Sequence, residues 1–314
     1  MLSVSGLVKI YPGPVAALRG VDLEIPEGLF GLLGPNGAGK STFMNMVAGL
    51  IEPTAGRILL DGTDTVKDPA FMRSRLGYLP QDFGFHPDLT GRAMLELLLQ
   101  LKGITGPKGR RALAEDLLDR VNLKHAMKRK VGGYSGGMRQ RLGLAQAIAG
   151  DPRVLIVDEP TAGLDPEERH RFYRLIAEMS TKRMVLLSTH IVDDVATLCP
   201  RLAVIRGGEV VADTTPSAAR NAIAGTIYEG FVPDAQLRTF AESWRVLSAV
   251  LVEGRTNKVR VHSASGQHPE GFSPATATLE DAYLVLMRTP VTQVPAALRK
   301  AEVAVAVVGA GGAA

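Results

Sequence analysis

Short apolar runs alternate with longer amphipathic stretches over the first two thirds of the chain. The runs predict strands at 21–25, 29–33, 57–60, 76–79, 154–157, 184–187 and 202–205. The stretches between them predict helices at 41–49, 92–102, 110–121, 137–149, 166–180 and 191–198. This alternation is typical of an α/β fold. The run at 154–157 is apolar at every position, which predicts a sheet covered on both faces.

The pattern weakens after Asp213. The remaining segments are a short helix opened by 214–216, a hairpin formed by 246–252 and 258–262, a polar loop at 263–274 and a helix at 279–287. We therefore predict a domain at 1–212, a small α+β domain at 213–290 and a flexible tail at 291–314.

Composition places the chain among ordinary globular proteins. It has 314 residues, of which 46% are hydrophobic and 22% charged, with a net charge of +4. Disordered, collagen-like and disulfide-stapled chains are excluded by these values. The single cysteine, Cys199, has no partner within the chain, which favours a cytosolic protein and a small buried side chain. The basic clusters at 108–111 and 124–130 are expected to be solvated helix faces, so no nucleic-acid partner is expected.

A glycine-rich segment lies between the apolar run at 29–33 and the helix predicted at 41–49. It fits the pattern G-x-x-x-x-G-K-[ST], in which backbone N–H groups surround phosphate oxygens and the lysine reaches the β and γ phosphates. The hydroxyl group of the following serine can hold Mg²⁺. The candidate phosphate-binding residues are Gly34, Pro35, Asn36, Gly37, Ala38, Gly39, Lys40, Ser41 and Thr42.

Two acidic residues, Asp158 and Glu159, end the apolar run at 154–157. They are expected at the carboxyl edge of the sheet, where ligands bind in α/β proteins. Asp158 would hold Mg²⁺ through water, and Glu159 would orient and polarise an attacking water. Together with the glycine-rich segment, these acids predict nucleotide hydrolysis.

The segment Tyr134-Ser135-Gly136-Gly137-Met138 precedes a predicted helix. It resembles the signature motif of ATP-binding cassette (ABC) ATPases, which usually has Leu at the first position and Gln at the last. Two glycines and a serine at a helix N-terminus form a second anion site. One chain has no need of two distant phosphate sites, whereas two chains arranged head-to-tail would use both.

Four further residues match positions of that family. The resemblance implies that Tyr11 stacks on adenine, that Gln81 contacts Mg²⁺ and water, that Asp165 reaches across a dimer, and that His190 lies near the γ-phosphate. Catalysis would then rest on Glu159, His190 and Gln81, with Mg²⁺ held by Ser41, Gln81 and Asp158. In trans, Ser135, Gly136, Gly137 and Asp165 would contact nucleotide. The implied fold is a P-loop core with a β-rich N-terminal subdomain and a helical subdomain at about 82–150.

The resemblance also implies an activity and partners. The segment from Tyr134 through Arg141 is similar to ATPases of the export branch, as is the Thr-Leu-Glu-Asp segment at 278–281. The expected protein hydrolyses ATP to drive transport through a separate membrane permease, docked near Gln81 and residues 82–90. It would pair with a second ABC ATPase subunit, identical or different, at the cytoplasmic face of the membrane.

Other interpretations of the same motifs remain open at this point. A soluble ABC ATPase could act on ribosomes or DNA, although such proteins typically carry two cassettes or long coiled-coil insertions. A regulatory nucleotide-binding module would not need Glu159 and His190. A nucleotide kinase sharing only the P-loop would not explain Ser135-Gly136-Gly137.

Overall fold

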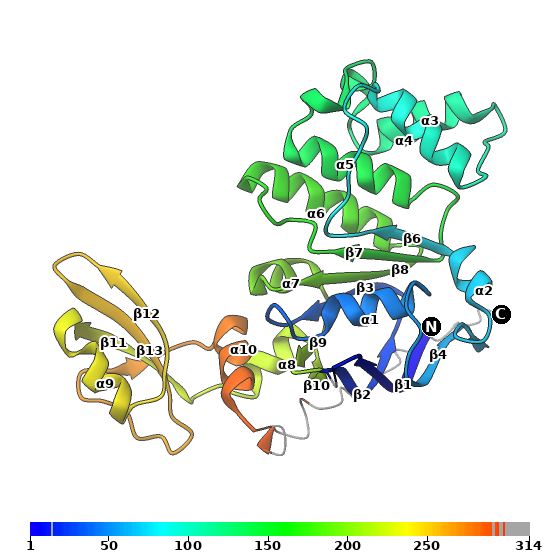
Figure 1. Cartoon of the computed structure of the whole chain (residues 1–314). Coiled ribbons are helices and arrows are strands. Elements are labelled where there is room, and N and C mark those ends of the chain that lie inside the picture. Colours follow the sequence, from blue (N-terminus) through cyan, green and yellow to red (C-terminus); the bar gives the residue numbers. More distant parts are fainter. Residues whose placement is uncertain (14, 291–292, 295–297, 299–314) are drawn as a thin grey trace, which may run out of the picture. The chain divides into compact units, whose positions relative to one another are not determined.

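The computed structural model describes residues 1–13, 15–290, 293–294 and 298. The chain divides into two compact units, Met1–Val211 and Ala212–Ala314, and Figure 1 shows the elements of each. Most of the predicted tail at 291–314 lies outside the described residues. Among the described residues, no helix is long and apolar enough to cross a membrane.

A six-stranded sheet forms the centre of the first unit, and its strand order does not follow the sequence. Five of its strands run parallel to one another, namely β9, β3, β8, β7 and β6. The seven predicted apolar strands are all confirmed, five of them in this sheet. In order across the sheet the strands are β10 (Glu209–Thr214), β9 (Arg201–Arg206), β3 (Gly28–Leu33), β8 (Met184–Thr189), β7 (Val154–Asp158) and β6 (Leu76–Leu79).

Helices and a second sheet cover this centre. Every residue of β7 and β8 is buried, as expected for a sheet covered on both faces. Phe43 and Met44 of α1 share one core with Ile156 and Leu186 of the sheet. The helices that contact the sheet are α1 (Lys40–Val47), α5 (Gly136–Ala147), α6 (Pro166–Ser180) and α7 (Val192–Leu198). Helix α1 ends two residues earlier than predicted, and Gly49 beyond it has a left-handed backbone at φ 68°.

The second sheet is antiparallel and packs its apolar side chains into the same core as α1. Strand β1 was not predicted, because serine and lysine interrupt its apolar pattern, and only the second half of β2 was predicted. A short helix, α2 (Pro69–Arg73), follows this sheet and was not predicted either. In order the strands are β2 (Val15–Ile25), β1 (Leu2–Tyr11), β4 (Ala55–Leu60) and β5 (Thr63–Asp64).

Three helices pack together beyond β6: α3 (Gly91–Leu101), α4 (Arg110–Arg120) and α5. Figure 1 shows them gathered on one side of the central sheet. Thr90 caps α3 by accepting a hydrogen bond from the backbone N–H of Ala93. Two 3₁₀ turns, Lys124–Ala126 and Val131–Gly133, lead from α4 to α5. The residues predicted as a helical subdomain, 82–150, include all three helices.

The described part of the second unit contains the predicted hairpin, three short helices and a four-stranded sheet. Strand β11 was not predicted, because glycine and proline interrupt its sequence. A side chain at Gly230 would clash with the ring of Phe272, so glycine allows this close packing. In order the strands are β12 (Val246–Val252), β13 (Thr256–His262), β11 (Ile227–Pro233) and β14 (Ser273–Pro274). The helices are α8 (Pro216–Asn221), α9 (Leu237–Ser243) after a 3₁₀ turn at Asp234–Gln236, and α10 (Leu279–Arg288).

Candidate active site

The glycine-rich loop joins β3 to α1, as predicted. Two of its glycines are required by close contacts. A side chain at Gly34 would clash with the backbone oxygen of Ile205, and one at Gly39 would lie 2.7 Å from that of Ala17. Gly39 also has φ 107°, a conformation that other residues rarely adopt. The motif spacing therefore follows from how the loop packs, as well as from its fit to phosphate.

Lys40, the first residue of α1, is buried at the end of this loop. Its Nζ donates hydrogen bonds to the backbone oxygens of Gly34 at 2.8 Å and Pro35 at 3.2 Å. The same Nζ lies 3.2 Å from Oε1 of Glu159. The loop thus fixes the ammonium group at its mouth, beside a buried carboxylate.

Glu159 follows the last residue of β7 and joins two other functional side chains. Its Oε1 contacts Lys40, and its Oε2 lies 2.9 Å from Nδ1 of His190. Its backbone has φ 45°, an uncommon value for a non-glycine residue, and its N–H donates to the oxygen of Ser188 at 3.0 Å. Such strained backbone is concentrated at functional sites. The structure therefore brings Lys40, Glu159 and His190 into one continuous polar chain.

Asp158 lies beneath Glu159, at the carboxyl edge of β7, with a side chain that is almost fully buried. Its Oδ1 has no hydrogen-bond partner. Burial raises the pKa of Asp158, and the neighbouring hydroxyl groups of Ser188 and Ser41 partly offset this rise. A buried carboxylate oxygen without a partner, close to a hydroxyl group, fits a site for Mg²⁺, which prefers such oxygen ligands.

A cavity of about 270 Å³ opens over the loop. Gln81 lines it from the end of β6, opposite the P-loop residues and Glu159. Of the predicted residues, the cavity thus gathers most of the phosphate-binding loop together with Gln81 and Glu159, whereas Asp158 and His190 are not part of its lining. Its lining is Ala17, Asn36, Gly37, Gly39, Lys40, Ser41, Thr42, Gln81 and Glu159.

Tyr11, Ser135 and Asp165 do not line this cavity. Tyr11 ends β1, where Nζ of Lys9 lies 5.3 Å from its ring centroid. Ser135 and Asp165 cap α5 and α6, accepting hydrogen bonds from the backbone N–H groups of Met138 and Glu168 at 3.2 and 2.8 Å. The structure therefore leaves the predicted trans residues outside the cavity of their own chain.

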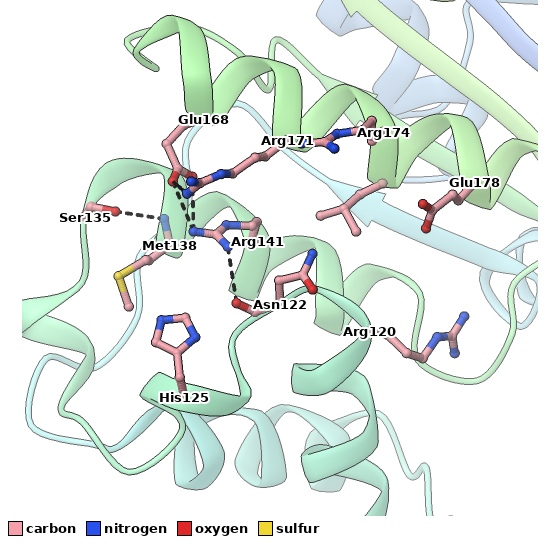
Figure 2. A pocket seen from close by; sticks show the side chains of 11 residues that line it. Arg120, Asn122, His125, Ser135, Met138, Arg141, Glu168, Arg171, Arg174 and Glu178 are labelled. Atoms are coloured by element: carbon pink, nitrogen blue, oxygen red, sulfur yellow. Dashed lines mark hydrogen bonds and ion pairs between the residues drawn. The ribbon is translucent and has the colours of Figure 1, made fainter.

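Ser135 lines a different pocket, of about 660 Å³, between α5, α6 and the end of α4. Figure 2 shows Arg141 of α5 reaching across it to Glu168 of α6, with Nη2 and Oε2 3.1 Å apart. Arg141 is buried and also donates to the backbone oxygens of Gly137 and Asn122. A side chain at Gly137 would clash with Glu168, so this glycine allows the two helices to approach. The ion pair thus joins the helix of the signature motif to the helix after Asp165.

The departure from the family motif at Tyr134 has a local explanation. The ring is buried, and its hydroxyl group donates to the backbone oxygen of Ala126 at 2.9 Å. A side chain at Gly91 would clash with that hydroxyl group, so Gly91 makes room for the tyrosine. The first position of the motif therefore serves the core of the helical region.

Sequence reasoning missed Asp194, which is buried at the start of α7. Its carboxylate accepts hydrogen bonds from the hydroxyl groups of Thr161 at 2.6 Å, Thr189 at 3.0 Å and Tyr173. These bonds connect the loop that follows Glu159 to the residue before His190. In sequence, Asp194 follows another aspartate in a helical first turn, where acids are common for local reasons, so no signal separated it from a surface residue.

Comparisons with known proteins agree with this geometry. Residues 18–162 match the ABC transporter family. The chain is 38% identical to the daunorubicin/doxorubicin resistance ATP-binding protein DrrA of Streptomyces peucetius, over 80% of this chain and 75% of that protein. It is 37% identical to the Nod factor export ATP-binding protein I of Burkholderia pseudomallei (strain 1710b), over 83% of this chain and 88% of that protein.

Solved structures give the same result. The chain aligns with the dimeric structure of a bacterial ABC transporter cassette at a TM-score of 0.62 and 28% identity, over 68% of this chain and 98% of that one. The alignment has the same values for a dimeric post-hydrolysis state of that cassette bound to ADP and Pi.

Proposed function

This chain belongs to the ABC transporter ATP-binding family, and from that membership we propose that it hydrolyses ATP to drive export through a separate membrane permease. The observation that carries the proposal is the chain from Lys40 through Glu159 to His190 at the mouth of the P-loop cavity. A nucleotide-binding module without hydrolysis would have no use for this carboxylate and imidazole.

We assign a role to each predicted side chain. The N–H groups of the P-loop and Lys40 would hold the β and γ phosphates. Glu159 would orient and polarise the attacking water, and His190 would hold the γ-phosphate from the other side. Ser41, Gln81 and Asp158 would hold Mg²⁺, which supplies positive charge to the phosphate oxygens. Tyr11 would stack on the adenine ring.

Completion of the site requires a second subunit, identical or different. Ser135, Gly136, Gly137 and Asp165 lie outside the cavity of their own chain, and a head-to-tail arrangement would bring them to the nucleotide of the partner. The dimeric form of the similar cassette supports this arrangement. Because ATP would contact both subunits only when they are closed, its binding energy would favour the closed dimer.

We place the chain peripherally on the cytoplasmic face of a membrane, with the permease docked near Gln81 and residues 82–90. That segment carries two partly exposed rings, Phe83 and Phe85, with centroids 5.2 Å apart. Aromatic side chains are enriched in the buried centres of protein interfaces. The names of the relatives support export, since they are a drug-resistance ATP-binding protein and a Nod factor export ATP-binding protein.

The hydrolytic role is tested by Glu159→Gln, with Glu167→Gln as the matched control. Glu167 is an exposed glutamate of α6 that pairs with Arg171. Glu159→Gln should bind ATP and dimerise, but hydrolyse it about a hundredfold more slowly or worse. The control should retain its rate. Near-normal turnover by Glu159→Gln would remove Glu159 from its assigned role.

The transport role is tested by trapping tagged Glu159→Gln with ATP in its native cell and identifying the proteins that co-purify from detergent-solubilised membranes. A polytopic membrane protein is the expected partner, and it should be absent with Lys40→Ala, which cannot form the ATP-bound dimer. Ribosomes or nucleic acid in its place would overturn the export proposal while leaving the ATPase intact.

A further inference from the structure

Within the residues of the second unit that the structure describes, strand β12 is a long sheet edge that no further strand pairs with. Its sheet order is β12-β13-β11-β14, so β12 lies at one edge and the two-residue β14 at the other. In the second half of β12, Val250, Leu251 and Val252 are 60%, 64% and 37% exposed. Phe231 of β11 is 65% exposed. Apolar exposure in this unit is therefore concentrated around one strand.

This edge lacks the features that normally prevent strands from pairing with other chains. Such edges usually carry lysine, proline, an inward-pointing charge or a bulge. Residues 248–252 contain no charged residue and no proline, and the irregularity in β12 lies before them, between Val246 and Ser248. The second half of β12 is thus regular, uncharged and open to a further strand.

The register of the sheet shows which side chains lie on each of its faces beside β12. Val250 of β12 and Phe231 of β11 both lie opposite Lys258 of β13, so the two apolar side chains share one face of the sheet. On the other face, Leu251 lies opposite the buried Asn257. A further strand with apolar residues on both faces would extend the sheet without exposing either set.

A hollow of about 530 Å³ lies beside the first half of β12, lined by residues 246–249 and by Trp244, Arg245 and Arg288. Arg245 donates to the backbone oxygen of Val285, and Arg288 to that of Val246. In the part of the chain that the structure describes, neither guanidinium group forms an ion pair with an acid. Burial, and then the charge of Arg288, lower the pKa of Arg245. An external carboxylate would fit this end of the strand.

Glu253 immediately follows β12 and is exposed, and no ion pair holds it among the described residues. The two ends of β12 thus differ in charge: two cations lie at its start and an acid directly follows its end. The exposed Arg255 lies further along the turn, where its backbone oxygen accepts a hydrogen bond from the N–H of Asp234 beside β11. An antiparallel copy of the same strand reverses this order. The acid of each copy would then reach the cations of the other, twice by symmetry.

We propose that β12 pairs antiparallel with β12 of a second copy of this chain, centred on Val250. Val250 then lies opposite its equivalent, Ala249 opposite Leu251, and Ser248 opposite Val252. The two four-stranded sheets become one continuous sheet, and each Glu253 reaches the start of the other strand. This contact needs no nucleotide, so it differs from the ATP-dependent dimer of the cassettes.

The first experiment measures association of the full chain without nucleotide, by sedimentation over a dilution series. The wild type should form a dimer. Ala249→Pro should raise the dimer dissociation constant about tenfold or more, because the N–H of residue 249 points away from β13 and proline has no N–H to donate to the new strand. Leu251→Lys should act in the same way through its charge. Leu50→Lys, an equal change at an exposed leucine of the first unit, should have no effect.

A symmetric crosslink tests the register. Val250→Cys should form an intermolecular disulfide, since directly opposite residues lie about 4.5–5.5 Å apart between Cα atoms. Val252→Cys is the matched control. In the proposed register its two copies lie about 13 Å apart, beyond disulfide reach. The native Cys199 is buried and does not compete.

Three results would overturn the proposal: a wild type that stays monomeric without nucleotide, equal crosslinking at positions 250 and 252, or a dimer unaffected by both Ala249→Pro and Leu251→Lys. The ATP-dependent dimer of Glu159→Gln should survive Ala249→Pro, so failure here leaves the proposed function untouched. A thermal unfolding profile that matches that of the wild type shows that each variant still folds.

Discussion

Replacing Arg141 with methionine should loosen the connection between α5 and α6. The guanidinium group of Arg141 makes a buried ion pair with Glu168 at 3.1 Å and donates to the backbone oxygens of Gly137 and Asn122, both at 3.3 Å. Methionine has a similar length and can fill the space, so the change removes charge and hydrogen bonds more than volume.

The expected loss in the free energy of unfolding depends on the ion pair that Glu168 retains. Breaking a buried ion pair by removing one partner costs about 3–5 kcal/mol, because a buried charge is left uncompensated. Glu168 retains Arg171, whose Nη1 lies 3.0 Å from its Oε1. We therefore expect the lower end, about 3 kcal/mol. In urea this corresponds to a midpoint lowered by about 1 M.

The assay is urea unfolding of the full chain, in which the unfolding transition of the first unit is monitored. It is carried out as a double-mutant cycle of Arg141→Met with Glu168→Gln. The two changes should couple by about 1–3 kcal/mol. Arg174→Met is the matched control, since Arg174 is exposed in the same pocket and has no ion pair in the described part of the chain. Its effect should stay within about 0.5 kcal/mol.

Arg141→Met should also change the rate of ATP hydrolysis, which gives a second measurement beside stability. The ion pair joins the helix that begins after Ser135 to the helix that begins after Asp165, and it lies outside the P-loop cavity. Arg141→Met should therefore lower kcat while ATP binding to one subunit is retained. Additive effects within about 0.5 kcal/mol in the cycle, or an unchanged kcat, would refute the reasoning.

Three further outcomes follow from the structure. Burial raises the pKa of the Cys199 thiol to about 12, so iodoacetamide should label it only after unfolding, and rapid labelling of the native chain would contradict its packing. Burial opposes ionisation of Asp281, but hydrogen bonds from Arg260 and then Thr278 together lower its pKa. The stability that Asp281 adds is therefore present above its ordinary value and is lost as the pH falls through the lowered one; Asp281→Asn should flatten this acid dependence in a pH series of thermal unfolding. Gly143→Ala should destabilise the chain by about 1–3 kcal/mol, because the new Cβ would lie 2.6 Å from Cδ1 of Leu79; an unchanged urea midpoint would show that the side chain moves away freely.

The central sheet could be predicted from sequence because burial on both faces leaves a local signal. The strand that ends at Asp158 is apolar at each preceding position, and a run this short and continuous is typical of a strand buried on both faces. The P-loop glycines were equally clear, because the spacing G-x-x-x-x-G-K-[ST] between a strand and a helix is a local pattern.

Features that depend on distant residues left no such signal. Strand β11 contains Gly230, where a side chain would clash with the ring of Phe272 on another segment. The pairing of Lys40 with Glu159 joins residues far apart in sequence, and neither residue type specifies its partner. Asp194 was hidden for the same reason, because its three hydroxyl partners come from separate elements. Tertiary contacts decided each of these cases.

The choice of serine at position 135 shows how one residue can serve both the fold and the proposed chemistry. Ser135 Oγ accepts a hydrogen bond from the backbone N–H of Met138 and so caps α5. This bond uses a lone pair and leaves the hydroxyl proton free to donate. Aspartate would cap the helix equally well, but its charge would repel a phosphate group and it has no proton to give. A residue that both caps this helix and donates to an anion must therefore carry a hydroxyl or an amide group, and next to two glycines serine is the smallest that does.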